Sequence, residues 1–176
     1  RYARDQKIDF TVVGPEVPLA LGIVDKFQDA GIPIFGPTMG AARVETSKSF
    51  AKELMLKYGV PTGKAMIFDD YFEACGYVQS LDGPIVIKAD GLASGKGVTV
   101  EKTREKALTA IRRQMVEDQF NGAGKRVLIE EYMDGREMSV FAFVDGQRIS
   151  SLVAACDYKK VGDRDTGLNT GGMGSY

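Results

Sequence analysis

The residues with the clearest chemical potential lie between Lys88 and Gly97, a segment that combines lysine with glycine. Glycine leaves backbone N–H groups uncovered and permits positive φ, while lysine brings positive charge to the same place. Because uncovered N–H groups beside positive charge bind phosphate, the segment predicts a phosphate site. The residues that carry this prediction are Lys88, Gly91, Ser94, Gly95, Lys96 and Gly97.

Short β-branched runs at 85–87 and 98–100 flank this loop and predict a strand, a Gly-rich loop and a returning strand. A P-loop needs four residues between its glycines, then Lys followed by Ser or Thr at the start of a helix. Here three residues separate Gly91 from Gly95, and Gly97 follows the lysine, so the P-loop is excluded. We expect a flap that closes over a nucleotide; on these residues alone, a flexible solvated hairpin is the alternative.

The N-terminal region alternates between strand and helix patterns. We expect strands at 8–13 and 32–35, in the rhythm of parallel strands of an open α/β sheet, where ligands bind beyond the carboxyl ends of the strands. Glu16 lies at such an end and is a candidate substrate contact; the alternative is a turn whose acidic residue favours a helix N-terminus. The apolar face of the intervening helix comprises Leu19, Ile23, Val24 and Phe27.

The pattern from 38 to 58 is helical with a break near Thr46, where Ser47 can cap a second helix. Lys48 and Lys52 are four residues apart on that helix and within reach of a phosphate, although such lysines are more often solvated. We place a domain boundary at the break. Residues 1–45 then belong to an N-terminal α/β domain, and residues 46–176 to a second domain of antiparallel hairpins and helices.

Further elements surround the flap. A strand is expected at 64–68, and Asp69 or Asp70 then caps a helix. After the flap, Thr103 caps another helix. The side chains expected to point inward are Phe72, Cys75 and Val78 on the first helix, and Ala107, Leu108, Ile111 and Met115 on the second.

The segment 127–137 contains a strand that turns sharply after Tyr132. Such a turn exposes backbone donors and acceptors, which an adenine ring needs, and Glu137 beyond it can accept both ribose hydroxyls. The alternative is an acidic, solvated hairpin. Asp145-Gly146 then predicts a hairpin into a strand near Arg148.

Composition limits the remaining classes. A net charge of -1, from 23 basic and 24 acidic residues, gives no reason to invoke nucleic acid or an anionic membrane, and the apolar runs are too short to span one. The chain has no histidine, and Cys75 and Cys156 form no CxxC pair, so imidazole catalysis is excluded and zinc or disulfides are not expected. This cysteine usage indicates a reducing cytoplasm.

Taken together, the order of strand lysine, Gly-rich flap, helix and acidic strand resembles the ATP-grasp superfamily, in which ATP lies between two α+β subdomains. Within it, the chain is similar to the phosphoribosylamine–glycine ligase family over nearly its whole length. The segments that carry the resemblance are 14–19, 35–38, 47–52, 86–98 and 169–174.

This resemblance implies the end of a parallel α/β domain followed by the first part of an ATP-grasp domain, with a flap subdomain at about 61–132. Lys48, Lys88 and the flap would contact ATP phosphates, and Glu137 the ribose. Main-chain atoms of Glu130 and Met133 would meet the adenine edge, and Glu131 would also belong to the nucleotide site. The substrate loop would present Asp157, Lys159, Asn169, Thr170, Gly171, Gly172 and Met173 to glycine and 5-phosphoribosylamine. The chain departs from the usual family pattern at Cys156, Tyr158, Lys160 and Leu168.

The reaction implied is ATP-driven amide formation through glycyl phosphate, giving glycinamide ribonucleotide, ADP and phosphate in purine biosynthesis. It needs no protein nucleophile, so positioning and charge neutralisation would carry the catalysis. Mg²⁺, or Mn²⁺, would be held by ligands beyond this chain, which we expect to be an incomplete and inactive piece of the enzyme. A different ATP-grasp ligase and a non-catalytic nucleotide-binding module are the alternatives. The sequence does not reveal the oligomeric state.

Overall fold

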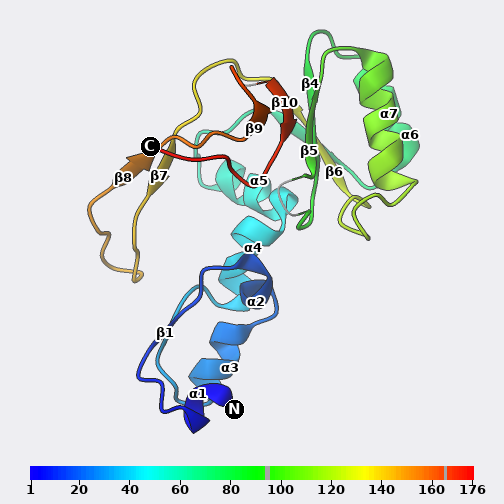
Figure 1. Cartoon of the computed structure of the whole chain (residues 1–176). Coiled ribbons are helices and arrows are strands. Elements are labelled where there is room, and N and C mark those ends of the chain that lie inside the picture. Colours follow the sequence, from blue (N-terminus) through cyan, green and yellow to red (C-terminus); the bar gives the residue numbers. More distant parts are fainter. Residues whose placement is uncertain (94–95, 165) are drawn as a thin grey trace.

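The computed structural model describes residues 1–93, 96–164 and 166–176 of the 176-residue chain. The predictions for Ser94 and Gly95, and for the side chain of Asn169, lie outside the described residues. Figure 1 shows an N-terminal part, a central sheet with helices, and a C-terminal part of hairpins.

The N-terminal part has two short strands that pair in parallel, as the sequence predicts. The prediction of a single helix between these strands is wrong, because Gly22 adopts a left-handed conformation with φ of 72° and divides the helix in two. The strands are also shorter than expected. The elements are α1 (Tyr2–Asp5), β1 (Thr11–Val12), α2 (Glu16–Ala20), α3 (Ile23–Asp29), β2 (Ile34–Phe35) and α4 (Met39–Thr46).

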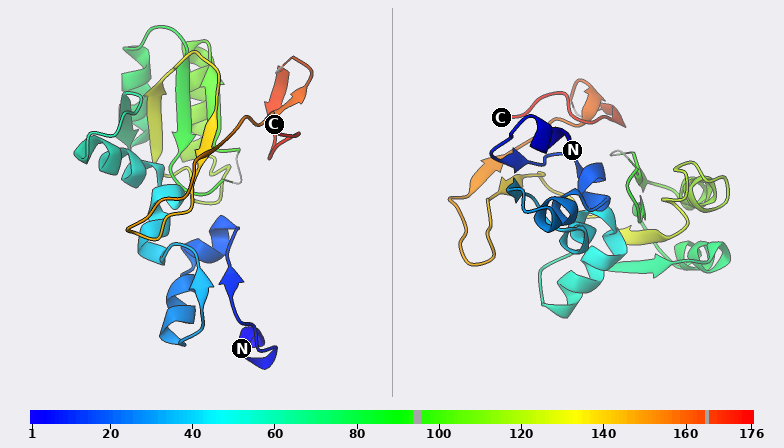
Figure 2. Two further views of the ribbon diagram at one scale, coloured as in Figure 1. Left: turned by 90° about the vertical axis from the view of Figure 1, so that its left-hand side faces the viewer. Right: turned by 90° about the horizontal axis from the view of Figure 1, so that it is seen from below.

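The central part is an antiparallel sheet with the strand order β3-β6-β4-β5. The strand β6 is the last of these four strands in the sequence, but it lies inside the sheet, between β3 and β4. Figures 1 and 2 show α6 and α7 together on one face of this sheet. The elements are α5 (Lys48–Lys57), β3 (Ala65–Phe68), α6 (Tyr71–Gln79), β4 (Ile85–Ala89), β5 (Val98–Glu101), α7 (Arg104–Met115) and β6 (Val127–Glu131).

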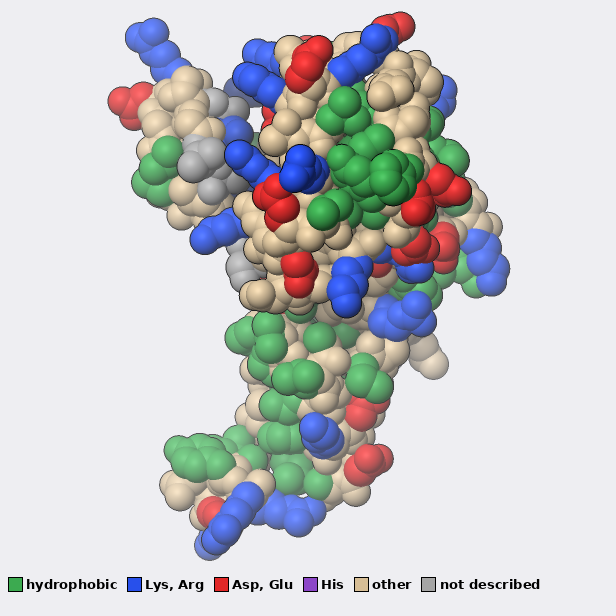
Figure 3. Space-filling view, turned by 90° about the vertical axis from the view of Figure 1, so that its right-hand side faces the viewer, with side chains coloured by type: hydrophobic (Ala, Val, Ile, Leu, Met, Phe, Trp, Pro, Cys, Tyr) green, Lys and Arg blue, Asp and Glu red, His purple; other side chains and the backbone are tan. Residues whose placement is uncertain are grey.

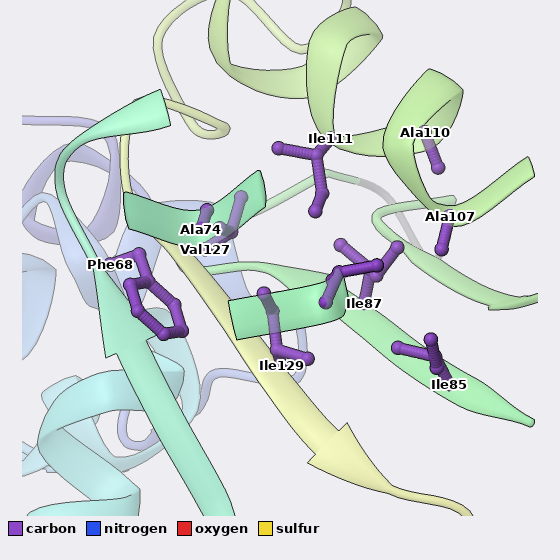
Figure 4. Packing of buried hydrophobic residues seen from close by; sticks show 10 residues of the cluster. Phe68, Ala74, Ile85, Ile87, Ala107, Ala110, Ile111, Val127 and Ile129 are labelled. Carbon is purple, nitrogen blue, oxygen red and sulfur yellow. The ribbon is translucent and has the colours of Figure 1, made fainter. Parts of the chain in front are cut away.

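Side chains that alternate along the strands build the core between the sheet and these two helices (Figure 4). Ile85 and Ile87 of β4 and Val127 and Ile129 of β6 point toward the helices and are buried. The residues that alternate with them face the opposite side of the sheet, where Val86 and Leu128 are buried and the side chains of Lys88 and Glu130 also lie.

The helix α6 buries a different face from the one expected. Val78 is buried and Cys75 packs against the core, as predicted. The prediction that Phe72 points inward is wrong, because this side chain is 77% exposed and Ala74 is buried instead. Asp70 caps the helix by accepting the N–H groups of Phe72 and Glu73, and from that start 74 and 78 share the inner face. Residue 72, about 200° around the helix from 74, points outward.

The other helix starts agree with the sequence. Ser47 caps α5 by accepting the N–H of Phe50, and Thr103 caps α7 by accepting that of Lys106. The stripe of α7 is confirmed: Ala107 and Ile111 are buried, and Leu108 and Met115 pack against the core. On the face shown in Figure 3, basic and acidic side chains are interspersed.

The C-terminal part consists of two antiparallel hairpins. A bridge between Val144 and Ile149 encloses the predicted turn at Asp145, but the prediction of a strand near Arg148 is wrong, because regular strand pairing begins only at Val153. The views in Figures 1 and 2 place the β9–β10 hairpin on the side of the central sheet that α6 and α7 do not cover. No helix in the part of the chain that the structure describes is long and apolar enough to cross a membrane. The strands are β7 (Ser139–Phe141), β8 (Val153–Ala155), β9 (Lys160–Gly162) and β10 (Thr166–Asn169).

Candidate functional site

The carboxylate of Glu130 joins two lysines on the face of the sheet opposite α6 and α7. Its Oε1 pairs with Nζ of Lys52, and its Oε2 pairs with Nζ of Lys88. Glu130 is only 7% exposed, whereas the side chain of Lys88 is 29% exposed. Burial alone would raise the pKa of Glu130, but the hydrogen bonds and charges of the two lysines outweigh burial and lower it. The carboxylate is therefore ionised near neutral pH.

Lys52 is neither a phosphate ligand nor a solvated lysine, which corrects the interpretation from sequence. It is 3% exposed, and its ammonium donates to Thr62 Oγ1 at 2.5 Å, to the carbonyl of Gly63 at 2.8 Å and to Glu130. An ammonium has three protons, so these acceptors use all of them. Lys52 thus connects α5 to the start of β3 and to β6.

Lys48, at the first position of α5, lies beside the base of the flap. Its Nζ donates to the carbonyl oxygen of Gly91 at 3.4 Å. Burial is the main cause that lowers the pKa of Lys48; the charge of Lys88 adds to this lowering, while Glu45 and Asp90 oppose it. Lys48 therefore lies beside the base of the flap, near enough to Lys88 for the two charges to interact.

Asp90 fastens the flap to the start of α5. Its Oδ1 accepts the N–H of Ser49 at 2.7 Å, and its Oδ2 accepts the Ser49 hydroxyl at 2.9 Å. The Ser47 hydroxyl donates to the same carboxylate at 3.2 Å. A carboxylate at a helix N-terminus satisfies free N–H groups and is stabilised by the helix dipole. The position of Lys48 is thereby fixed.

Close backbone packing explains two of the flap glycines. A Cβ on Gly97 would lie 2.8 Å from the Cβ of Ala93, and one on Gly91 would lie 3.0 Å from the Cβ of Ala123. Lys96 is exposed at the described end of the flap. These contacts concern the base of the flap, where the chain returns to the sheet.

The predicted adenine edge lies at the end of β6. The N–H of Glu131 donates to the carbonyl of Lys64, and its Oε1 accepts the N–H of Lys64 at 2.7 Å. The main-chain groups of Glu130 consequently point the other way, toward β4, with which it pairs. Met133, beyond the strand, is exposed and lies over Gly63.

The structure brings together two residues that the sequence assigned to different ligands. Nζ of Lys159, a predicted substrate contact, pairs with Oε1 of Glu137, the predicted ribose acceptor, and lies 3.8 Å from Asp157. The hydrogen bond to Glu137 is the main cause that raises the pKa of Lys159. This ion pair links Glu137, which precedes β7, to the segment around Lys159 that the sequence predicts to be a substrate loop.

The Gly-rich end of the chain folds back on the same loop. Thr170 donates its N–H and its hydroxyl to the carbonyl of Lys159, and its Oγ1 accepts the N–H of Gly172. The N–H of Met173 donates to the carbonyl of Tyr158 at 2.7 Å, and Gly171 lies between these contacts. By contrast, Glu16 is exposed at the start of α2, and the described hydrogen bonds and ion pairs do not join it to this group.

Sequence reasoning missed the side-chain roles of Lys52, Asp90 and Glu130. The only local signal was the pattern Ser47-x-Ser49, which offers two hydroxyls at a helix start. The partners lie 41 residues apart for Ser49 and Asp90 and 78 apart for Lys52 and Glu130. Such pairs are visible only once the sheet is formed.

The arrangement suits a polyphosphate. Lys48 and Lys88 supply positive charge beside the N-terminus of α5 and the base of the flap. The first N–H groups of α5 are already bonded to Asp90 and Ser47, so it is the charge of the lysines that this place offers to phosphate. Over the residues that the structure describes, no group of three or more His, Cys, Asp or Glu side chains comes together as a cation site. The lysines and glycines thus fit the phosphates of a nucleotide.

The antiparallel sheet, the flap after β4 and the converging lysines define an ATP-grasp domain. A model described as "Phosphoribosylglycinamide synthetase, ATP-grasp (A) domain" matches residues 46–176, and one described as "Phosphoribosylglycinamide synthetase, N domain" matches residues 1–45. This chain belongs to the phosphoribosylglycinamide synthetase family.

Comparisons with individual proteins support this family assignment. The phosphoribosylamine–glycine ligase of Halalkalibacterium halodurans is 51% identical over 99% of this chain and 41% of that protein. The crystal structure of phosphoribosylamine–glycine ligase from Thermotoga maritima has a TM-score of 0.80 at 32% identity, covering 99% of this chain and 44% of that one. D-alanine–D-alanine ligase from Bacillus anthracis, at 19% identity, shares the fold alone, with a TM-score of 0.65 over 96% of this chain and 54% of that one. The chain spans about two fifths of the length of its curated relatives.

Proposed function

We propose that this chain provides the nucleotide-phosphate site of a phosphoribosylamine–glycine ligase. The observation that carries the proposal is the convergence of Lys48 and Lys88 on the base of the flap, in a chain 51% identical to a ligase of that name. The reaction joins the glycine carboxylate to the amine of 5-phosphoribosylamine, and ATP supplies the phosphoryl group that activates the carboxylate. We further propose that it takes place in the cytoplasm.

In this proposal the residues act by position and charge. Lys48 and Lys88 neutralise the phosphates, which lowers the electrostatic cost of bringing a carboxylate near them. The main chain at Met133, past the end of β6, holds the adenine, because that of Glu130 is paired within the sheet, and Glu137 holds the ribose. Contacts to glycine and phosphoribosylamine come from Glu16, Asp157, Lys159 and the Gly-rich segment 169–173.

We propose that the chain divides into two domains near residue 46. Residues 1–45 form the C-terminal part of an N-terminal α/β domain, and residues 46–176 form the ATP-grasp part, with a flap subdomain at about 61–132. The break between α4 and α5 at Ser47 supports the boundary. Magnesium or manganese would assist the phosphates, with ligands outside the described acidic side chains.

Nucleotide binding is tested first, by calorimetric titration of this chain with ADP. Lys88→Ala is expected to weaken ADP binding about tenfold or more, because a charge-assisted contact to phosphate is lost. Lys102→Ala, which alters an exposed lysine at the end of the same hairpin, is the matched control and leaves the affinity unchanged. If the unaltered chain does not bind ADP, or if both variants bind it equally, the phosphate site is refuted.

The ligase reaction is tested by exchanging this chain for the corresponding segment of the Halalkalibacterium halodurans ligase. The chimera should release phosphate from ATP only when glycine and phosphoribosylamine are both present, and Lys88→Ala in the chimera should abolish most of that release. A folded chimera that accepts another carboxylate in place of glycine would refute the proposed substrate. It would favour a different ATP-grasp ligase.

A further inference from the structure

Glu130 connects a buried lysine to a partly exposed one. One carboxylate oxygen pairs with Lys52, whose other donors are taken by Thr62 and Gly63, and the second oxygen pairs with Lys88. The first pair is fully enclosed, whereas Lys88 keeps a side chain that is 29% exposed. Lys52 consequently anchors one oxygen of the carboxylate on its buried side, and the other oxygen binds the ammonium of Lys88.

Rotamer freedom gives this arrangement its importance. A lysine has four rotatable bonds, and an unheld Lys88 would lose that freedom only on meeting a ligand. Ordering it beforehand removes part of that entropic cost. Glu130 also places one negative charge between Lys52 and Lys88, whose positive charges would otherwise repel each other in a half-buried place.

We propose that Glu130 is a positioning residue that acts through Lys88: its carboxylate, anchored by Lys52, holds the Lys88 ammonium in place for a nucleotide phosphate. This inference rests on the proposed nucleotide site and gives the side chain of Glu130 a role there, while its main chain pairs within the sheet. Lys52 is then an anchor with no contact to nucleotide. The ligand class is a nucleoside polyphosphate, and adenosine without phosphate gains nothing from the arrangement.

The first test needs no nucleotide. The chain and its Glu130→Gln variant are labelled briefly with an amine-reactive acylating reagent, and the modified lysines are quantified by mass spectrometry. The amide of glutamine keeps the shape of the side chain but loses the charge, so Lys88 should react about fivefold to tenfold faster, in line with the loss of one charge-assisted hydrogen bond. Exposed Lys102 should react equally in both proteins. An unchanged rate at Lys88 would overturn the inference.

The second test separates positioning from a general structural effect. Glu130→Gln should weaken ADP binding about tenfold while leaving adenosine binding within about twofold, because only phosphate meets Lys88. In a Lys88→Met background, Glu130→Gln should cause no further loss of ADP affinity, since it acts through that lysine. Equal weakening of ADP and adenosine, or an undiminished loss in the Lys88→Met background, would show that Glu130 only supports the fold.

A variant that leaves Lys52 as an uncompensated buried charge could unfold. The pair Lys52→Met with Glu130→Gln removes one buried charge of each sign and keeps a folded comparison available. It should show the same rise in Lys88 labelling. The two failures remain distinct: absence of ADP binding by the unaltered chain contradicts the nucleotide site, whereas an unchanged Lys88 labelling rate contradicts the role of Glu130.

Discussion

The main-chain N–H of Lys48 donates to the carbonyl oxygen of Asp90 at 3.1 Å, so the first residue of α5 is bonded to the residue that follows β4. The side chains of these residues add to the connection, because the Asp90 carboxylate accepts from Ser47 and Ser49. The helix start and the base of the flap therefore move as one unit, and both predicted phosphate lysines are fixed relative to it.

Replacing Asp90 should weaken this unit. Asp90→Asn keeps the size of the side chain but removes its charge at the N-terminus of α5 and leaves only one accepting oxygen for three donors. We expect the free energy of unfolding to fall by about 1–3 kcal/mol, measured by urea denaturation. Asp134→Asn, at an exposed position, should change it by less than about 0.5 kcal/mol. Equal stability of both variants would contradict the role of Asp90.

Lys48 should make nucleotide binding sensitive to alkaline pH. Burial lowers its pKa below the ordinary lysine value of 10.5, so the free protein loses this positive charge earlier than an exposed lysine does as pH rises. The affinity for ADP, measured by titration between pH 7 and 10, should therefore fall as pH rises. Lys48→Arg keeps its charge throughout and should flatten the profile. The same decline in both proteins would show that Lys48 is not the titrating group.

Glu137 and Lys159 should have opposite effects on nucleotide affinity. Glu137→Gln removes a charged acceptor for the two ribose hydroxyls and should weaken ADP and adenosine alike, by about tenfold. Lys159→Met instead releases Glu137 from its ion pair, so ADP should bind as well as before or more tightly. Calorimetric titration of both variants measures this. Loss of affinity in Lys159→Met comparable to that in Glu137→Gln would remove Glu137 from the ribose site.

Two glycines in the flap subdomain should respond in opposite directions to alanine. A Cβ on Gly97 would meet Ala93 at 2.8 Å and Ala89 at 3.2 Å, so Gly97→Ala forces a backbone shift and should cost about 1–3 kcal/mol of stability. Gly76 lies in α6 with open space around it, and Gly76→Ala should stabilise the chain by up to about 1 kcal/mol. Thermal unfolding of both variants tests the contrast. A stabilised Gly97→Ala protein would contradict the packing at the flap base.

Local patterns predicted most of the central part of the fold. The caps at Ser47, Asp70 and Thr103 and the β4–β5 hairpin depend on residues close in sequence, and all are confirmed. The failures come from packing. Phe72 is apolar and falls in a helix, but the start of α6 turns it outward, and only the sheet decides which side of that helix is inside.

The part of the candidate site that is formed by residues close together in the sequence could be predicted. Lys88 and the flap glycines stand in one segment, so their association with phosphate could be inferred from composition. The ion pair of Lys52 with Glu130 could not, because each residue alone resembles a solvated surface charge. Their burial follows from the pairing of β6 with β3 and β4, a long-range event without a local signal.

The central position of β6 also orders the events of folding. Among the four strands of its sheet, β6 is synthesised last, yet it lies between β3 and β4, so the sheet cannot form fully until residues 127–131 are present. Closing such a long loop is entropically costly and slow. Before that, β3 and the β4–β5 hairpin present free edges to other chains, and two lysines lack their shared counterion. We therefore expect a chain interrupted before β6 to aggregate, which makes the arrival of Glu130 the event that commits this domain to its fold.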